Sequence, residues 1–207
     1  MPIQYLPVEQ ALTHPGLRMV VVGNVPSPWG EAAKGILHIK NIDWVAVRLA
    51  YLEFMSRPVL DNGGQILKFL GDGFLATFDL SQAGTQSVCI AAVRAAEQLM
   101  ASSPGFNAQR QRDGKRTLDF GVAVHLGEVL YGNVGTSERL DFTVVGSAVN
   151  EASRIEGLCR VLRRNVLMSS RFHDAAAACH GRMISVGVHA LRSIREPQEL
   201  FTLGGAT

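Results

Sequence analysis

The sequence predicts an α/β (α+β) fold in which a β-sheet is flanked by helices. Short apolar runs of strand length alternate along the chain with longer segments whose apolar residues recur at helical spacing. Two apolar runs joined by the tight Gly71-Asp72-Gly73 stretch predict a β-hairpin. With 207 residues, 47% of them hydrophobic, the chain can bury one sizeable core, or one domain with a fragment of another.

The N-terminal part is expected to run strand, helix, strand. Residues 19–22 form a β-branched run of strand length, and residues 31–39 suit a helix. Residues 44–47 suit a second strand or the start of the next helix, which apolar spacing predicts over 49–60. Asn and Gly at 62–64 predict the end of that helix, because both residues tolerate the left-handed conformation.

The rest of the chain continues the alternation. We expect strands at 65–70 and 74–78, a helix over 82–102, and a polar loop over 103–115 that contains Pro104 and Gly105. The pattern then predicts strands at 118–125, 128–134 and 142–145, a helix at 148–159, and strand-like runs at 183–186 and 200–203.

Charge and cysteine content exclude several classes of protein. The net charge is +2 and no long basic run occurs, so we expect no nucleic-acid partner. The irregular spacing of Cys89, Cys159 and Cys179 does not suit a zinc site, and their odd number argues against a disulfide framework. We find no signal peptide and no apolar run long enough to span a membrane. A reduced, cytoplasmic protein is the expectation.

The predicted hairpin carries two candidate site residues. Its Gly-Asp-Gly turn would project the Asp72 carboxylate from a rigid strand end, which suits Mg²⁺ bound together with substrate phosphates. An ordinary turn aspartate is the alternative interpretation. Lys68 either directs its ammonium group at a purine ring or is a solvated lysine on an edge strand.

A second group of candidates lies on the helix expected at 148–159. Asn150 and Arg154 are four residues apart, so they share one helix face. An amide beside a guanidinium can bind a ribose and a phosphate. The alternative is an exposed polar face on which Arg154 pairs with Glu151 or Glu156.

Taken together, these blocks resemble the class III adenylate/guanylate cyclase catalytic domain. Three patterns occur in order: Lys-x-x-Gly-Asp-Gly-x-x-Ala-x-Phe, Gly-x-x-x-His-x-Gly, and Phe-Thr-x-x-Gly-x-x-Val-Asn-x-Ala-x-Arg-x-Glu. The resemblance extends from about residue 52 to residue 203 and includes Gly132-Asn133-Val134-Gly135 and Arg195-Glu196-Pro197. We therefore assign residues 51–207 to an N-terminally incomplete cyclase domain.

The resemblance implies a role for each matching residue. Asp72 corresponds to one of two metal-binding aspartates, and Lys68 with Thr143 to the pair that recognises the base, in the form that favours ATP and is typical of the IIIb subgroup. Asn150 and Arg154 correspond to the catalytic pair that positions the ribose and stabilises the transition state. The implied activity is conversion of ATP to cyclic AMP with Mg²⁺ or Mn²⁺, in a homodimer whose sites lie across the interface.

The first metal-binding aspartate of the family is missing. Members open the domain with a strand that ends in Asp-Ile-x-Gly-Phe-Thr, and no such block lies upstream of Asp72. Glu31 and Asp43 are the substitutes to consider. Impaired turnover is therefore expected, and the alternative function is a catalytically inactive cyclase-homology module that dimerises or binds nucleotide.

Residues 1–50 resemble a different kind of protein. A strand-length run, a Ser27-Pro28 turn and a helix are similar to the thioredoxin-like opening of glutathione-transferase-like proteins. In that opening the N-terminus of the helix can bind an anionic thiol. Thiol binding through Ser27 is a third, minor hypothesis, because the rest of that fold is missing.

Overall fold

A computed structural model describes the chain apart from residues 1–4, 7, 16, 22–35, 37–38, 41–43, 49, 71, 82, 137–138 and 205–207. The chain divides into two compact units, Met1–Arg57 and Pro58–Thr207. Across the described residues, helices and strands alternate around sheets, which confirms the α/β fold class. No helix in the described part of the chain is long and apolar enough to cross a membrane.

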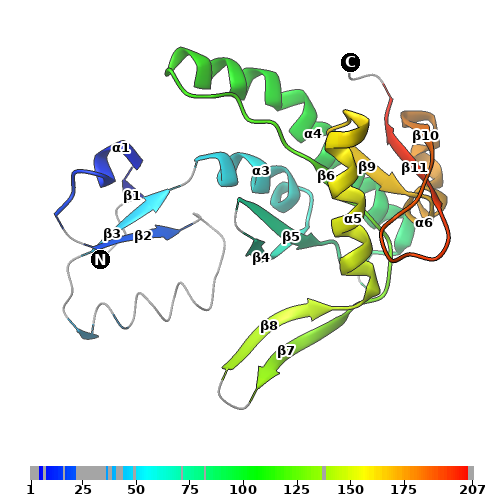
Figure 1. The fold of residues 1–207 in the computed structure, drawn as a ribbon, viewed down its shortest axis with the longest axis horizontal. Coiled ribbons are helices and arrows are strands. Elements are labelled where there is room, and N and C mark those ends of the chain that lie inside the picture. Colours follow the sequence, from blue (N-terminus) through cyan, green and yellow to red (C-terminus); the bar gives the residue numbers. More distant parts are fainter. Residues whose placement is uncertain are drawn as a thin grey trace. The chain divides into compact units, whose positions relative to one another are not determined.

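The first unit contains a parallel sheet. Strands β1 (Tyr5–Leu6) and β2 (Leu17–Val21) both pair with β3 (Trp44–Arg48), giving the order β1-β3-β2 (Figure 1). Helix α1 (Val8–Ala11) follows β1, and α3 (Ala50–Asp61) continues past the division between the units. The strand expected at 19–22 is confirmed as far as Val21, and residues 44–47 form a strand rather than the start of a helix. The helix expected over 31–39 falls mostly outside the described residues.

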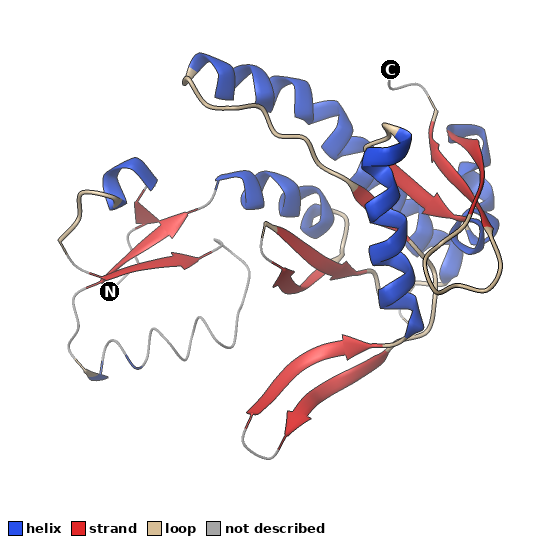
Figure 2. Cartoon of the chain, in the orientation of Figure 1, coloured by secondary structure: helices blue, strands red, loops and turns tan. Residues whose placement is uncertain are grey.

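A four-stranded sheet forms the centre of the second unit. It contains β6 (Val122–Val124), β9 (Val166–Ser169), β10 (Met183–His189) and β11 (Gln198–Leu203), in the order β10-β11-β9-β6. Figure 2 shows strands in red and helices in blue. Strand β9 runs parallel to β6 and antiparallel to β11. The last strand in sequence therefore lies inside the sheet, between β10 and β9.

Helices cover both faces of this sheet. On one face, Ile155 and Cys159 of α5 (Ser147–Leu162) pack with Leu167 and Leu200. On the other, α4 (Thr85–Arg112), α6 (Ser170–Ala175) and a 3₁₀ helix (Ala177–Arg182) pack around Val166, Met168 and Phe201. Neighbouring strand residues thus serve opposite cores, as the two-residue period of a strand requires.

Two antiparallel hairpins complete the second unit. One consists of β4 (Gln65–Leu70) and β5 (Gly73–Thr77), and confirms the hairpin predicted from the Gly-Asp-Gly turn. The other consists of β7 (Leu130–Thr136) and β8 (Arg139–Val145), a long two-stranded ribbon (Figure 1). Strand β4 contacts β8, so the two hairpins meet at these strands although they form separate sheets.

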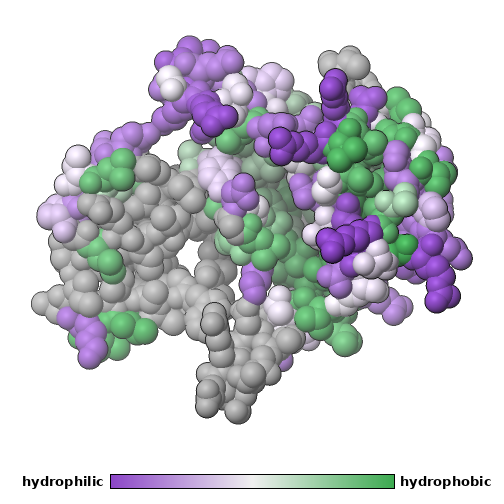
Figure 3. Space-filling view, viewed as in Figure 1, coloured by the Kyte–Doolittle hydropathy of each residue, from purple (hydrophilic) through white to green (hydrophobic). Residues whose placement is uncertain are grey.

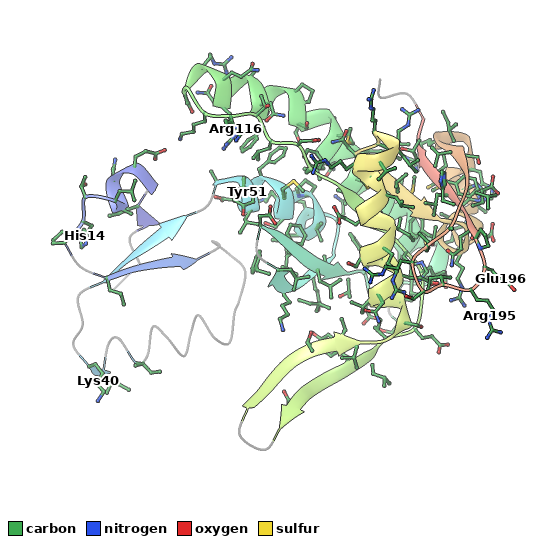
Figure 4. All side chains as sticks on the ribbon, viewed as in Figure 1. His14, Lys40, Tyr51, Arg116, Arg195 and Glu196 are labelled. Carbon is green, nitrogen blue, oxygen red and sulfur yellow. The ribbon has the colours of Figure 1, made fainter. Side chains whose placement is uncertain are left out.

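The loop predicted at 103–115 is wrong, because α4 continues to Arg112 with Pro104 inside it. Polar contacts hold this extension to the returning chain. Asn107 exchanges two hydrogen bonds with the backbone of Leu118, at 2.8 and 3.0 Å, and Arg110 Nε donates to the Arg116 carbonyl at 2.7 Å. Figure 4 labels Arg116 on the chain that returns beside α4. Hydrophilic residues cover the far end of α4 (Figure 3). Tertiary contacts therefore outweigh the helix-breaking tendency of Pro and Gly here.

Two further differences concern the central sheet. The strand expected over 118–125 is confined to Val122–Val124. Strand β9 and helix α6 had no counterpart in the sequence-based prediction. All four residues of β9 are buried, so the strand lacks the polar–apolar alternation of a half-exposed strand.

Candidate functional site

The β4–β5 hairpin presents Lys68 and Asp72. Leu70 pairs with Gly73, which leaves Asp72 exposed in the tight turn. The register shifts between Ile66 and Lys68, so a β-bulge lies directly before the lysine. Bulges re-aim the side chains that follow them, and this one sets the direction of the half-buried Lys68.

Strand β8 presents Thr143 beside an open position. Thr143 is half-buried and pairs with Gly132 of β7. A Cβ built on Gly132 would meet no other atom within 4 Å. Because Gly132 has no side chain, the surface next to Thr143 can admit another molecule.

Helix α5 presents Asn150 and Arg154. The buried residues Ala148, Ile155 and Cys159 lie on one side of the helix. At 3.6 residues per turn, Asn150 and Arg154 fall on the opposite side. Asn150 is exposed and Arg154 half-buried, so both lie where a ligand can reach them.

A glycine fixes the start of α5. Gly146 immediately precedes the helix with φ of 156°, and a Cβ there would lie 3.0 Å from the Glu128 carbonyl oxygen. The positive φ disfavours any residue other than glycine, and the short distance to the Glu128 carbonyl leaves too little room for a side chain. The turn from β8 into α5 therefore sets the position of Asn150 relative to Thr143.

The Gly-x-x-x-His-x-Gly motif proves to be a packing motif. A Cβ on Gly127 would lie 2.5 Å from Ala148 Cβ, and a Cβ on Gly121 would lie 2.9 Å from Cys159 Cβ. The two glycines let the β6 segment approach α5 at both ends of the helix. His125, between them, is buried against Glu151 of the same helix, and neither residue was among the sequence-predicted site residues.

Among the described residues, Asp72 is the one carboxylate that matches the metal-binding motif of the sequence analysis. They contain no group of three or more His, Cys, Asp or Glu side chains that could hold a metal ion. Asp72 is exposed, and its carboxylate is of the kind that binds Mg²⁺ together with substrate phosphates. Glu31 and Asp43, the expected substitutes for the missing aspartate, and Ser27 of the transferase-like segment lie outside the described residues.

Residues 52–203 match the family model of the adenylate and guanylate cyclase catalytic domain. This match covers well over half of the chain. The chain belongs to this family. The cyclase assignment accounts for the order of the motifs and for the mixed sheet flanked by helices.

Several curated relatives of this cyclase chain carry adenylate cyclase names. It is 35% identical over 119 residues to an adenylate cyclase of Anabaena cylindrica, across 58% of this chain and 23% of that protein. It is 36% identical over 119 residues to the terminal-differentiation-specific adenylate cyclase of Dictyostelium discoideum, across 58% of this chain and 5% of that protein. The match thus spans less than a quarter of either relative.

Solved cyclase structures have the same fold. The guanylyl cyclase Cya2 superposes with a TM-score of 0.62 at 26% identity, covering 76% of this chain and 78% of that one. The adenylyl cyclase CyaB from P. aeruginosa superposes with a TM-score of 0.63, covering 89% and 86%; its identity of 23% supports the fold alone. The structural neighbours therefore include both an adenylyl and a guanylyl cyclase.

Proposed function

We propose that this cyclase domain converts ATP to cyclic AMP and pyrophosphate. The observation that carries the proposal is the contact between β4, which bears Lys68, and β8, which bears Thr143. Two half-buried polar side chains from distant parts of the sequence thus lie on neighbouring strands. The adenylate cyclase names of the curated relatives support the choice of adenine.

The chemistry of the two side chains suits adenine. The Lys68 ammonium group has three hydrogen-bond donors and no acceptor, so it needs an acceptor such as a ring nitrogen. The Thr143 hydroxyl can accept a hydrogen bond from the exocyclic amine. The open position at Gly132 leaves room for the base beside Thr143. The Lys-Thr combination is also the one typical of the IIIb subgroup.

Asn150 and Arg154 would act on the ribose and the phosphates. In the reaction the ribose 3′ oxygen attacks the α-phosphorus and loses its proton, a new P–O bond forms, and the bond to the β-phosphate breaks to release pyrophosphate. The Asn150 amide orients the ribose for this attack. The planar Arg154 guanidinium hydrogen-bonds the phosphoryl oxygens and stabilises the negative charge that develops on them.

Asp72 would hold a divalent cation, Mg²⁺ or Mn²⁺. When bound, such an ion would neutralise phosphate charge and stabilise the negative charge on the attacking and leaving oxygens. With a single carboxylate to bind it, the ion would be held less firmly than in a two-aspartate site. We therefore propose slow turnover rather than none.

The assembly we propose is a homodimer with two sites across its interface. One protomer supplies Asp72, and its partner supplies Lys68, Thr143, Asn150 and Arg154. The β7–β8 ribbon supports an interface, because its Leu130 and Tyr131 side chains are 75% and 54% exposed. Large apolar side chains gathered on one ribbon are typical of an association surface.

A turnover assay tests this proposal. The purified chain is incubated with ATP or GTP and Mg²⁺ or Mn²⁺, and the cyclic products are separated and quantified by mass spectrometry. We expect cyclic AMP above the level of an Asp72→Ala variant, and at least about tenfold less cyclic GMP. No cyclic AMP above that control, or a preference for GTP, would contradict the proposal.

The second candidate function is a binding module that holds nucleotide or dimerises without turnover. The lack of any group of three or more potential metal ligands among the described residues favours it. Titration with a fluorescent ATP analogue, combined with sedimentation, separates the two functions. Binding or dimerisation without product indicates the module, and a folded chain that does neither contradicts both functions.

A further inference from the structure

A buried polar cluster lies behind the proposed catalytic helix. We call it the α5 anchor cluster, and it consists of His125, Glu151, Ser169 and Gln198. His125 follows β6, Glu151 is on α5, Ser169 ends β9, and Gln198 begins β11. The cluster therefore joins α5 to three strand ends of the central sheet.

The groups around His125 favour one of its two neutral tautomers. Ser169 Oγ already accepts from the backbone N–H of Phe172 at 3.2 Å, where Ser169 caps helix α6. Its hydroxyl hydrogen is then available to His125 Nδ1, 2.9 Å away. The acceptor-only carboxylate of Glu151, whose Oε2 lies 3.2 Å from Nε2, favours the tautomer in which Nε2 carries the hydrogen and Nδ1 accepts from Ser169.

The surroundings keep His125 neutral. Its side chain is 2% exposed, and this burial is the main reason that its pKa is lowered. Glu151 acts in the opposite direction and raises the pKa, whereas Arg171 of α6 lowers it further. A proton added to Nδ1 would reverse its bond to Ser169, so that the Ser169 hydroxyl hydrogen would need another acceptor.

The cluster is not arranged for stability alone. Two of its buried polar atoms have no hydrogen-bond partner among the described residues, namely His125 Nε2 and Gln198 Oε1. Nε2 lies within ion-pair distance of Glu151, but the two groups are not aligned for a hydrogen bond. Apolar side chains would fill this space without the free-energy cost of burying unpaired polar atoms. We therefore look for a functional role of the cluster.

The cluster acts on the first turns of α5. Gln198 Nε2 donates to Glu151 Oε1 at 3.0 Å, while His125 faces the other carboxylate oxygen. Glu151 is thus hydrogen-bonded on one side and lies against His125 on the other. Because Glu151 directly follows Asn150, fixing its side chain fixes the rotation of this turn, and with it the directions of Asn150 and Arg154 on the outer face.

We propose that neutral His125 is a positioning residue for Asn150 and Arg154, acting through Glu151. This inference rests on the proposed cyclase function. Ser169 has no contact with substrate in this role, because it is fully buried and its oxygen caps α6. The Ser169–His125–Glu151 series therefore orients a helix and performs no nucleophilic chemistry.

Two substitutions of His125 distinguish its contact with Glu151 from its contact with Ser169. In His125→Gln, the side-chain amide reaches the place of Nε2 and keeps a donor toward Glu151. In His125→Asn, the shorter amide keeps an acceptor near Ser169 and does not reach Glu151. We expect His125→Asn to lower kcat for cyclic AMP about ten- to a hundredfold with little change in KM, and His125→Gln to retain most of the wild-type kcat.

The pH profile provides a readout that a purely structural role would not change. In the wild type, kcat should fall on the acid side as His125 is protonated, below about pH 6.5. His125→Gln has no imidazole and should lose this acid limb. Equal kcat values for the two variants, or an unchanged acid limb in His125→Gln, would overturn the proposal.

Hydrogen exchange keeps the test independent of turnover. We expect faster amide exchange over residues 147–154 in His125→Asn than in His125→Gln, with no difference over 155–162. If the wild type makes no cyclic nucleotide, the proposed function fails, and this exchange pattern alone decides the positioning role. If His125→Asn does not fold, Glu151→Gln replaces it in the test. A lower kcat and faster amide exchange over 147–154, at an unchanged Tm, would support the proposal. A kcat and an exchange rate equal to those of the wild type would overturn it.

Discussion

Gly127 lies so close to Ala148 that a single added methyl group would come within 2.5 Å of the Ala148 Cβ. The contact joins the end of the β6 segment to the first turn of α5. His125 Nε2 lies within 3.0 Å of the same added carbon. The position thus controls both the packing of α5 and the buried cluster beside it.

Gly127→Ala should destabilise the domain. The overpacked side chain would push α5 away and cost about 1–3 kcal/mol in the free energy of unfolding, measured by urea denaturation. Gly157→Ala is the matched control on the same helix, because a Cβ there meets nothing within 4 Å. It should be neutral or stabilise by about 0.5–1 kcal/mol. Similar effects of both substitutions would contradict the packing role of Gly127.

Gly132→Ala should affect nucleotide handling and not stability. A Cβ at Gly132 meets no atom of the protein, so the free energy of unfolding should change by less than about 0.5 kcal/mol. The methyl group would instead occupy the space beside Thr143, and KM for ATP should rise several-fold. Gly105→Ala, in the polar end of α4, serves as the control. A Gly132→Ala variant with wild-type KM would show that the base does not lie there.

Pro104→Ala should stabilise α4. Pro104 is exposed inside the helix and cannot donate the backbone hydrogen bond of its position. Replacing it should raise the free energy of unfolding by about 1–3 kcal/mol, measured by thermal and chemical denaturation. Pro197→Ala, in the exposed segment before β11, should by contrast be neutral or slightly destabilising. A loss of stability in Pro104→Ala would contradict the helical extension.

Ionisation of Cys159 should lower the free energy of unfolding in alkaline solution. Burial raises the pKa of its thiol to about 11, against 9.0 for an ordinary cysteine. As pH rises above 9, the unfolded chain loses this proton first, so ionisation favours unfolding. The loss should reach about 1 kcal/mol at pH 10 and be absent in Cys159→Ala. An identical pH slope in both proteins, or rapid reaction of Cys159 with a thiol reagent at pH 8, would refute this.

The parts of the fold that sequence could predict were those with a strong local signal. The Gly-Asp-Gly turn predicted the β4–β5 hairpin, and apolar spacing predicted α5. The extension of α4 depends on Asn107 bonding to Leu118, eleven residues away, which no local pattern reports. For β9 a weak signal existed, since Val166–Met168 is a continuous apolar run of the kind found in doubly covered strands.

The candidate site divides in the same way. Lys68, Asp72, Thr143, Asn150 and Arg154 were chosen from motifs, and their roles remain predictions. The structure adds the contact between β4 and β8 and the bulge before Lys68. His125 is joined to Ser169 across 44 residues of sequence, so only the folded chain reveals that the two share one cluster.

The position of β11 between β10 and β9 has a consequence for the order of folding. Leu200 and Phe201 are each buried, on opposite faces of the sheet, and Thr202 bonds the carbonyl of Val166. Neither layer of the sandwich can close before these residues exist. The second unit therefore cannot complete its folding until residue 203 has been synthesised. A nascent chain that stops earlier leaves both hydrophobic cores incomplete and exposed.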